Sequence, residues 1–303
     1  ACTRAGGVAG RGGRAAVRAV RTAVGGTVAT CLRYRVTGLA AEGGFFALLS
    51  LPPLVLGLVA CLGYVGRWLG VEDVAAVRSQ IVDLTSAVLT PSVVESVVVP
   101  TFDSVTTSGR ADVTLVAFAF SVWSGSRALN VYVDTIAIMY GLGGVRGIVR
   151  TRALSLSLYL LGLVLGVVVV PLVLVGPSLL GRWLPAEAQF VIGLYWPVVV
   201  LLTVAGLGTL YHIATPVRGR WRRDLPGAGL ALLLWVVVSS VLREIIAQSL
   251  GGASIYGPLA SPIVVLVWLY VLAIAVLIGA AFNSTLDRMW PGGARGVGRP
   301  PRS

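Results

Sequence analysis

The sequence contains few of the residues that soluble enzymes use for chemistry. Lysine is absent, His212 is the only histidine, and 12% of the residues are charged, against about 25% in an average soluble domain. One histidine cannot form a two-histidine metal site, and three cysteines (Cys2, Cys31 and Cys61) lack the spacing of a zinc site or a disulfide framework. We therefore expect no enzymatic activity, no catalytic residue, no metal and no cofactor. For His212 we expect a local hydrogen bond near a span end.

Long apolar segments dominate the chain instead. Hydrophobic residues make up 56% of it, and the mean hydropathy is +0.90. A membrane-spanning helix needs about 20 mostly apolar residues. Six stretches meet this requirement: Phe45–Tyr64, Val113–Met139, Leu154–Val175, Phe190–Ile213, Ala228–Leu250 and Pro262–Phe282. The sequence thus predicts an all-α integral membrane protein with six transmembrane helices.

Arginine is distributed unevenly among the segments that join these stretches. The N-terminal segment, the second and fourth loops and the C-terminal tail together hold 18 of the 24 arginines, whereas the other three loops hold four. Cytoplasmic segments of membrane proteins carry the excess of basic residues. Because the bias alternates at every loop, the pattern predicts that both termini are cytoplasmic.

Residues 1–43 form a basic segment before the first span, unlike a signal peptide because it is long and leads into a full-length span. Four arginines share one arc of a helical projection and three valines share another: Arg11, Arg14, Arg18 and Arg21, and Val17, Val20 and Val24. One interpretation is an amphipathic helix on the inner leaflet, against anionic lipids. The other is a solvated, partly disordered tail, which five glycines between residues 6 and 13 favour.

The long first loop, on the extracytoplasmic side, has helical periodicity of its own. Apolar residues recur there one helical turn apart, at Val74, Val77, Ile81, Leu84 and Val88. Residues 92–95 have the pattern of a capping box. We expect one or two short amphipathic helices in this loop, within a transmembrane domain that covers residues 44–289. Residues 290–303 are expected to be a disordered cytoplasmic tail.

Polar residues inside the predicted spans are costly, since an ionisable group at the bilayer centre costs at least about 2.5–3.5 kcal/mol. The second span has a narrow polar stripe, made of Trp123, Arg127, Asn130 and Asp134. The fifth span has a broad polar face, made of Ser239, Ser240, Arg243, Glu244 and Gln248. We expect the stripe of the second span to face the interior of the helix bundle.

Arg127 and Glu244 are expected at converging depths. Side chains lean toward the N-terminus of their own helix, and the two predicted spans run in opposite directions. We hypothesise that the two residues pair. One interpretation is a structural ion pair that fixes helix register, and the other is a gate or binding pair on a translocation path. The candidate residues of this polar path or ion pair are Arg127, Asn130, Asp134, Ser240, Arg243 and Glu244.

Several short motifs, in their order and spacing, resemble the YihY/BrkB family of bacterial inner-membrane proteins. They lie at residues 45–54, 123–129, 225–228, 256–260, 266–270 and 279–283. The family usually has an acidic residue where this chain has Ala281. The resemblance implies a six-helix protein of the bacterial cytoplasmic membrane, similar to relatives discussed as transporters of small solutes or lipids and in serum resistance. The resemblance also implies that the label ribonuclease BN, which members often carry, is a misannotation.

Three functions remain as hypotheses. The first is a transporter or permease that moves an unidentified solute or lipid between spans two and five. The second is a non-catalytic membrane protein that supports envelope integrity or assembly. A membrane-bound ribonuclease comes last, because one histidine and no metal cluster give it no support. We expect a lipid bilayer as partner and no nucleic acid, and the oligomeric state stays open.

The orientation is tested by fusing a reporter that is active on one side of the membrane only. A cytoplasmically active reporter should work after residue 303 and fail after residue 90, in the first loop, because the arginine bias holds both termini inside. A periplasmically active reporter should give the reverse pattern. Equal activity at both positions would contradict the predicted orientation.

Overall fold

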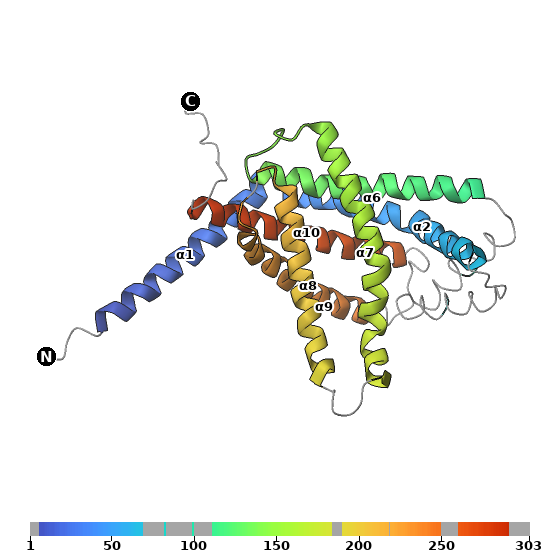
Figure 1. Cartoon of the computed structure of the whole chain (residues 1–303). Helices are drawn as coiled ribbons and strands as arrows, with labels where there is room; N and C mark the ends of the chain where they lie inside the picture. Colours follow the sequence, from blue (N-terminus) through green and yellow to red (C-terminus); the bar gives the residue numbers. More distant parts are fainter. Residues whose placement is uncertain are drawn as a thin grey trace. The chain divides into compact units, whose positions relative to one another are not determined.

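In the part of the chain that the computed structural model describes, all regular secondary structure is helical (Figure 1). That part comprises residues 6–68, 82, 99, 111–183, 190–217, 219–249 and 260–290. It contains seven α-helices and a short 3-10 helix: α1 (Gly6–Arg33), α2 (Val36–Trp68), α6 (Ala111–Met139), α7 (Ile148–Trp183), α8 (Phe190–Ala214), η3 (Trp221–Arg223), α9 (Leu225–Ser249) and α10 (Ala260–Met289). The predicted all-α class is confirmed for these residues.

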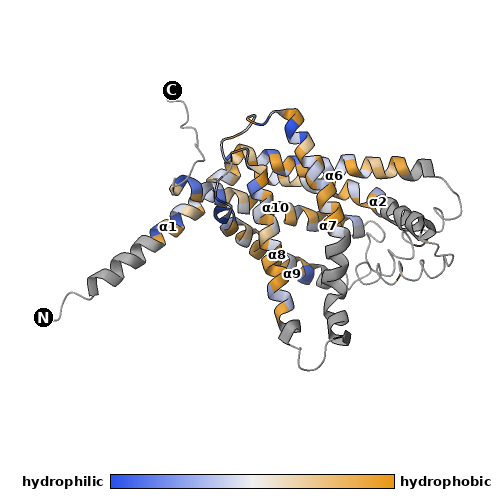
Figure 2. Cartoon of the chain, viewed as in Figure 1, coloured by the Kyte–Doolittle hydropathy of each residue, from blue (hydrophilic) through white to orange (hydrophobic). Residues whose placement is uncertain are grey.

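Each of the six apolar stretches coincides with one long helix, α2 and α6 to α10. Four described segments are long and apolar enough to cross a membrane: Ile148–Gly166, Leu194–Ala214, Trp221–Ile245 and Pro262–Met289. Figure 2 shows the apolar residues running along these helices. The membrane class is thereby supported, while the count of six spans and the orientation of the termini stay predictions.

Many large aliphatic side chains on these helices lie at the surface. Val164 is 62% exposed and Leu201 is 67% exposed. A soluble protein rarely exposes contiguous apolar patches, whereas lipid tails solvate them at no cost. The exposed aliphatic rows are therefore what a bilayer requires.

The predicted division into a basic N-terminal segment, a transmembrane domain and a C-terminal tail stays a prediction. The N-terminal segment is helical from Gly6 onward in spite of its glycines, which favours the helical interpretation over a disordered tail. The short helices expected in the first loop fall on residues that are not described, apart from Val82 and Val99. Residues 291–303, the larger part of the predicted tail, also lie outside the described residues.

The chain divides into two compact units, which are described separately. Unit 1 comprises residues 1–44, 131–151 and 202–303, and unit 2 comprises residues 45–130 and 152–201. Helices α2, α6, α7 and α8 each contribute one part to each unit. The candidate residues are thereby distributed over both units.

Unit 1 is built on the close approach of α9 and α10. A Cβ atom on Gly227 would collide with the carbonyl oxygen of Gly279 and with the side chain of Asn283, and one on Gly279 would collide with the carbonyl oxygen of Gly227. Only glycine lets two helix backbones approach this closely. Tyr211 of α8 is fully buried beside them, where its hydroxyl donates to the carbonyl oxygen of Val276 at 2.7 Å.

Glycines elsewhere behave differently. Gly162 and Gly166 of α7 have the four-residue spacing that is common where helices pack closely. A Cβ atom at either position would nevertheless meet nothing within 4 Å. The spacing of two glycines does not reveal which face of the helix is covered.

Replacing Gly227 by alanine should destabilise the protein by about 1–3 kcal/mol, because the new methyl group cannot fit without separating the two helices. The measurement is the midpoint of thermal unfolding of the purified protein in detergent. Gly229→Ala, two residues along the same helix, is the matched control, since a Cβ atom there meets nothing within 4 Å. An equal effect of both substitutions would contradict the role of the close contact.

Candidate functional site

The polar face of α6 in unit 2 is anchored to α2 by two serines. The hydroxyl of Ser121 donates to the carbonyl oxygen of Ser50 at 3.1 Å, and that of Ser124 donates to the carbonyl oxygen of Phe46 at 3.0 Å. Both serines are fully buried. Interhelical hydrogen bonds of this kind contribute about 0.6–2 kcal/mol in membranes. They fix the rotation of α6 relative to the part of α2 that belongs to unit 2.

Arg127 lies next to these serines and is half-buried. Its guanidinium carbon lies 5.1 Å from the centre of the Phe46 ring. A cation over an aromatic face gains about 0.5–2 kcal/mol, more where water is excluded. The positive charge of Arg127 is thus stabilised by the aromatic ring of Phe46, within the described part of unit 2.

The remaining residues of the predicted stripe are divided between the interior and the surface. The side-chain oxygen of Asn130 lies 3.5 Å from the hydroxyl of the buried Ser155 on α7. Trp123 is 52% exposed and Asp134 is exposed. The expectation that the whole stripe faces the bundle is therefore wrong for these two residues. The buried face of α6 instead follows the two serines.

The candidates on α9 lie in unit 1. Ser240, Arg243 and Glu244 are all exposed, and the hydroxyl of Ser240 donates to the carbonyl oxygen of Val236 within its own helix at 2.8 Å. Arg127 and Glu244 belong to different units. Their pairing stays a prediction.

Two buried polar atoms on α9 have no hydrogen-bond partner among the described residues. They are the indole nitrogen of Trp235 and the hydroxyl oxygen of Ser239. With Arg243, these residues follow one another at intervals of four, so they form one row along the helix. The Trp235 ring packs edge-on against Trp268 of α10, with the ring centres 5.8 Å apart. We call Trp235, Ser239 and Arg243 the donor row.

A second polar cluster holds the ends of four helices together in unit 1. Asn283 of α10 donates to the carbonyl oxygen of Asp224 at 2.8 Å and accepts from the backbone N–H of Gly227 at 2.7 Å. The first N–H groups of a helix have no partner within it. Asn283 therefore satisfies one of them at the start of α9.

The carboxylate of Asp224, at the same helix start, is fully buried. It lies 3.1 Å from Nδ1 of His212 on α8, which confirms the expected local hydrogen bond. Asp287 of α10 lies 3.6 Å from a guanidinium nitrogen of Arg223. These contacts connect η3 and the start of α9 to α8 and α10.

Two arginines bind the carbonyl groups at helix C-termini. Arg146 donates to three carbonyl oxygens at the end of α8, those of Ile213, Ala214 and Thr215, at 3.0–3.3 Å. Arg288 donates to the carbonyl oxygen of Met139, the last residue of α6, at 2.7 Å. A positive charge is favourable there because the unpaired carbonyl groups and the helix dipole are negative. Burial lowers the pKa of the Arg146 guanidinium from its ordinary value.

The sequence revealed these contacts only incompletely. Arg127 and Asn130 were singled out as polar residues in an apolar segment, whereas Asn283 entered only as the last residue of the motif at 279–283. Ser121, Ser124 and Trp235 were missed as contact residues, since serine and tryptophan are ordinary in a membrane helix. A regular spacing of serines on one face was the available signal. Among the described residues no group of three or more His, Cys, Asp or Glu side chains could hold a metal ion.

Exposed aliphatic rows outside and paired polar groups inside define a helical membrane protein. Its family follows from comparison with known proteins, because the family described as Virulence factor BrkB matches residues 27–302. The chain belongs to this BrkB family, as the short motifs predicted.

Two relatives illustrate how the family is named. The chain is 25% identical over 255 residues to the "Putative ribonuclease-like protein YfkH" of Bacillus subtilis (strain 168), which covers 82% of this chain and 89% of that protein. It is 37% identical over 102 residues to a "UPF0761 membrane protein" of Tolumonas auensis (strain DSM 9187 / NBRC 110442 / TA 4), which covers 34% of this chain and 33% of that protein. No solved structure matches the chain.

Replacing Asn283 by leucine should destabilise the protein by about 1–3 kcal/mol, because the buried N–H of Gly227 loses its acceptor. Thermal unfolding of the purified protein measures the effect. Ser284→Ala is the neighbouring control: its hydroxyl bonds only to Ala281 of the same helix. If Asn283→Leu is as stable as Ser284→Ala, Asn283 does not hold α9 to α10.

Proposed function

We propose that the chain is a transporter or permease of the bacterial inner membrane, with both termini in the cytoplasm. It moves a small solute or a lipid along a path that uses the polar residues of α6 and α9. The BrkB family membership supports a membrane protein, and the polar residues within the apolar helices support transport.

The donor row is the single observation that carries the proposal. A buried donor without an acceptor costs about 1–3 kcal/mol in proteins, and in a bilayer no water offsets that cost. Trp235 and Ser239 both lie within the apolar segment Trp221–Ile245 and lack a partner among the described residues. An unpaired buried group is explained if a ligand supplies its hydrogen-bond partner while the protein functions.

The chemistry of the row restricts the substrate. An indole N–H and a guanidinium can only donate, and a serine hydroxyl can donate as well. Their complement is a group with acceptor oxygens, such as a carboxylate, a phosphate or an ester carbonyl. The indole rings of Trp235 and Trp268 would accommodate an apolar portion beside it. A lipid or an organic anion fits this description.

A non-catalytic role in envelope integrity or assembly is the second candidate. The observation that favours it is the satisfied set of polar contacts in unit 2, where Ser121, Ser124 and Asn130 all have partners on other helices. Polar residues paired in this way hold helices together without moving anything. The two candidates therefore differ in whether the donor row matters for activity.

Nuclease activity is not proposed. The word ribonuclease occurs in the name of the YfkH protein of Bacillus subtilis, and it is the label that the family often carries by misannotation. Incubation of the purified protein with labelled RNA, with and without divalent cations, is the check, and we expect no cleavage above a mock preparation.

The transport proposal is tested by reconstitution into lipid vesicles. Entry of radiolabelled organic anions and scrambling of a fluorescent phosphatidylglycerol are measured for the wild type and for Trp235→Phe and Ser239→Ala. Each variant should lose about tenfold or more in rate, because one hydrogen bond to a charged substrate group is lost. Their unfolding midpoints should stay the same or rise, since an unpaired buried group has been removed.

Two controls separate function from structure. Ser157→Ala removes an exposed hydroxyl of α7 that bonds only within its own helix, and its rate should equal that of the wild type. Arg127→Glu combined with Glu244→Arg should recover the rate lost in each single variant if the two residues pair. Absence of transport by the wild type, or full activity of both donor-row variants, would favour the non-catalytic role instead.

A further inference from the structure

Helix α1 has one face packed against the rest of unit 1. Its residues Ala23, Thr27 and Thr30 are buried, and α1 contacts α10. A Cβ atom on Gly26 would meet the side chain of Thr285 on α10, so the two helices approach closely there. The rotation of α1 about its own axis is thereby fixed.

The face of α1 that turns away from α10 is apolar and uncovered. Its five aliphatic residues are 51–75% exposed: Val17, Val20, Val24, Val28 and Leu32. They recur at intervals of three and four residues and so form one stripe along the helix. We call these five residues the valine stripe. A stripe of this length is exposed by a soluble surface only where something covers it.

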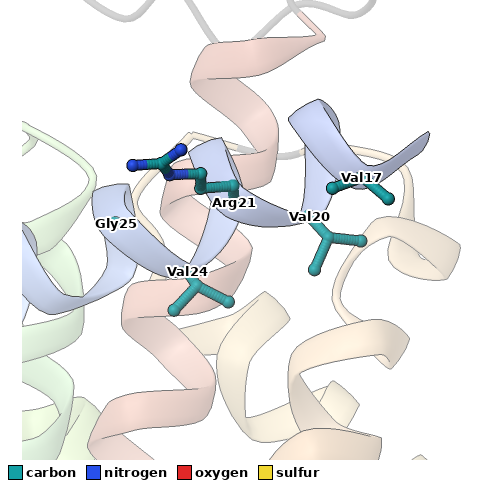
Figure 3. Close-up of a pocket in the computed structure, with 5 residues that line it drawn as sticks. All are labelled: Val17, Val20, Arg21, Val24 and Gly25. Atoms are coloured by element: carbon teal, nitrogen blue, oxygen red, sulfur yellow. The ribbon is translucent and has the colours of Figure 1, made fainter. Parts of the chain in front are cut away.

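Arginines border the valine stripe. Arg18 and Arg21 are both exposed, and the chain has no acidic residue before Glu42. A groove on α1 is lined by Val17, Val20, Val24, Arg21 and Gly25 (Figure 3). Figure 3 shows the valines pointing to one side of the helix and Arg21 pointing away from them. The groove is thus a hydrocarbon surface, and the guanidinium of Arg21 points away from it.

A break in the helix separates α1 from α2, so the two helices need not share one axis. Arg35 lies between the two helices with φ of +50°, a left-handed conformation that non-glycine residues rarely adopt. It interrupts the helix directly before Val36, where α2 begins. A helix that simply extended the first membrane segment would not need this interruption.

We propose that α1 docks on the surface of an anionic bilayer, with the valine stripe at the level of the upper acyl chains and with Arg18 and Arg21 against lipid phosphates. A phospholipid presents the required combination, an anionic group directly beside hydrocarbon. Helices with a basic flank and an apolar face lie in the interface in this way. The contact with α10 would then transmit the state of the membrane surface to the helix pair α9–α10.

The test places an environment-sensitive fluorophore on α1 of the full-length protein in nanodiscs. Single cysteines replace Val20 or Ala29 in a variant whose three native cysteines are serines. Ala29 is exposed and lies half a turn around the helix from Val20. In nanodiscs of phosphatidylglycerol and phosphatidylcholine in equal parts, the label at position 20 should be quenched by brominated acyl chains. The label at position 29 should be quenched by aqueous iodide.

Charge dependence identifies the lipid. Arg18→Gln with Arg21→Gln should shift the docking equilibrium roughly 30-fold toward the water-exposed state, because each basic residue near an anionic surface contributes about fivefold. High salt, or nanodiscs of phosphatidylcholine alone, should act in the same direction. Arg220→Gln with Arg222→Gln removes the same charge from two exposed residues at η3, and docking should be unchanged.

Three results would overturn the proposal. The first is equal iodide quenching at positions 20 and 29 in anionic nanodiscs. The second is protection of position 20 that does not depend on lipid charge. The third is disulfide crosslinking between position-20 cysteines of two copies, which would assign the stripe to a second copy of the chain. None of these results depends on transport activity, so the outcome is independent of the proposed function.

Discussion

The contact between α9 and α10 is the interaction on which unit 1 depends. Gly227 and Gly279 bring the two backbones so close that neither position has room for a methyl group. Asn283 lies beside them. Its amide oxygen accepts from the N–H of Gly227 and its amide nitrogen donates to the carbonyl oxygen of Asp224, both at the start of α9. Without a hydrophobic driving force between helices in lipid, such close packing and hydrogen bonding must supply the association. The position of α10 then determines where Tyr211 and α1 can pack.

The helix ends in unit 1 are also held by hydrogen bonds from polar side chains. Apolar helices leave four N–H groups and four carbonyl groups unpaired at their termini, and here the chain's sparse polar residues are used to pair them. Arg146 and Arg288 bind carbonyl groups at the ends of α8 and α6, and His212 lies against the buried Asp224. Much of the small polar content of this sequence is therefore structural in unit 1, which makes an unpaired donor in the same unit more informative.

Against this background the donor row and the valine stripe differ from the rest of the described protein. The buried Ser121, Ser124 and Asn283 have partners on neighbouring helices. Trp235 and Ser239, in contrast, have buried donors without acceptors among the described residues. Most other exposed aliphatic side chains lie on the long apolar helices, whereas the valine stripe is bordered by arginines on a helix outside the predicted spans. One feature indicates a ligand within the membrane and the other indicates contact with its surface.

The sequence by itself determined the class and the helices, because hydrophobic length is a property of segments and needs no tertiary contact. The short motifs determined the family, because their order and spacing can be read along the chain. It also identified Arg127 and Asn130 as polar residues within an apolar segment, and the helical projection of the basic N-terminal segment. The tertiary structure decided which faces are covered. It placed Trp123 and Asp134 at the surface, left Gly162 uncovered and Gly227 in a close contact, and aligned Ser121 and Ser124 with the backbone of α2. The physical reason is that helical periodicity fixes which residues share a face, while the neighbour that this face meets depends on residues far away in the chain.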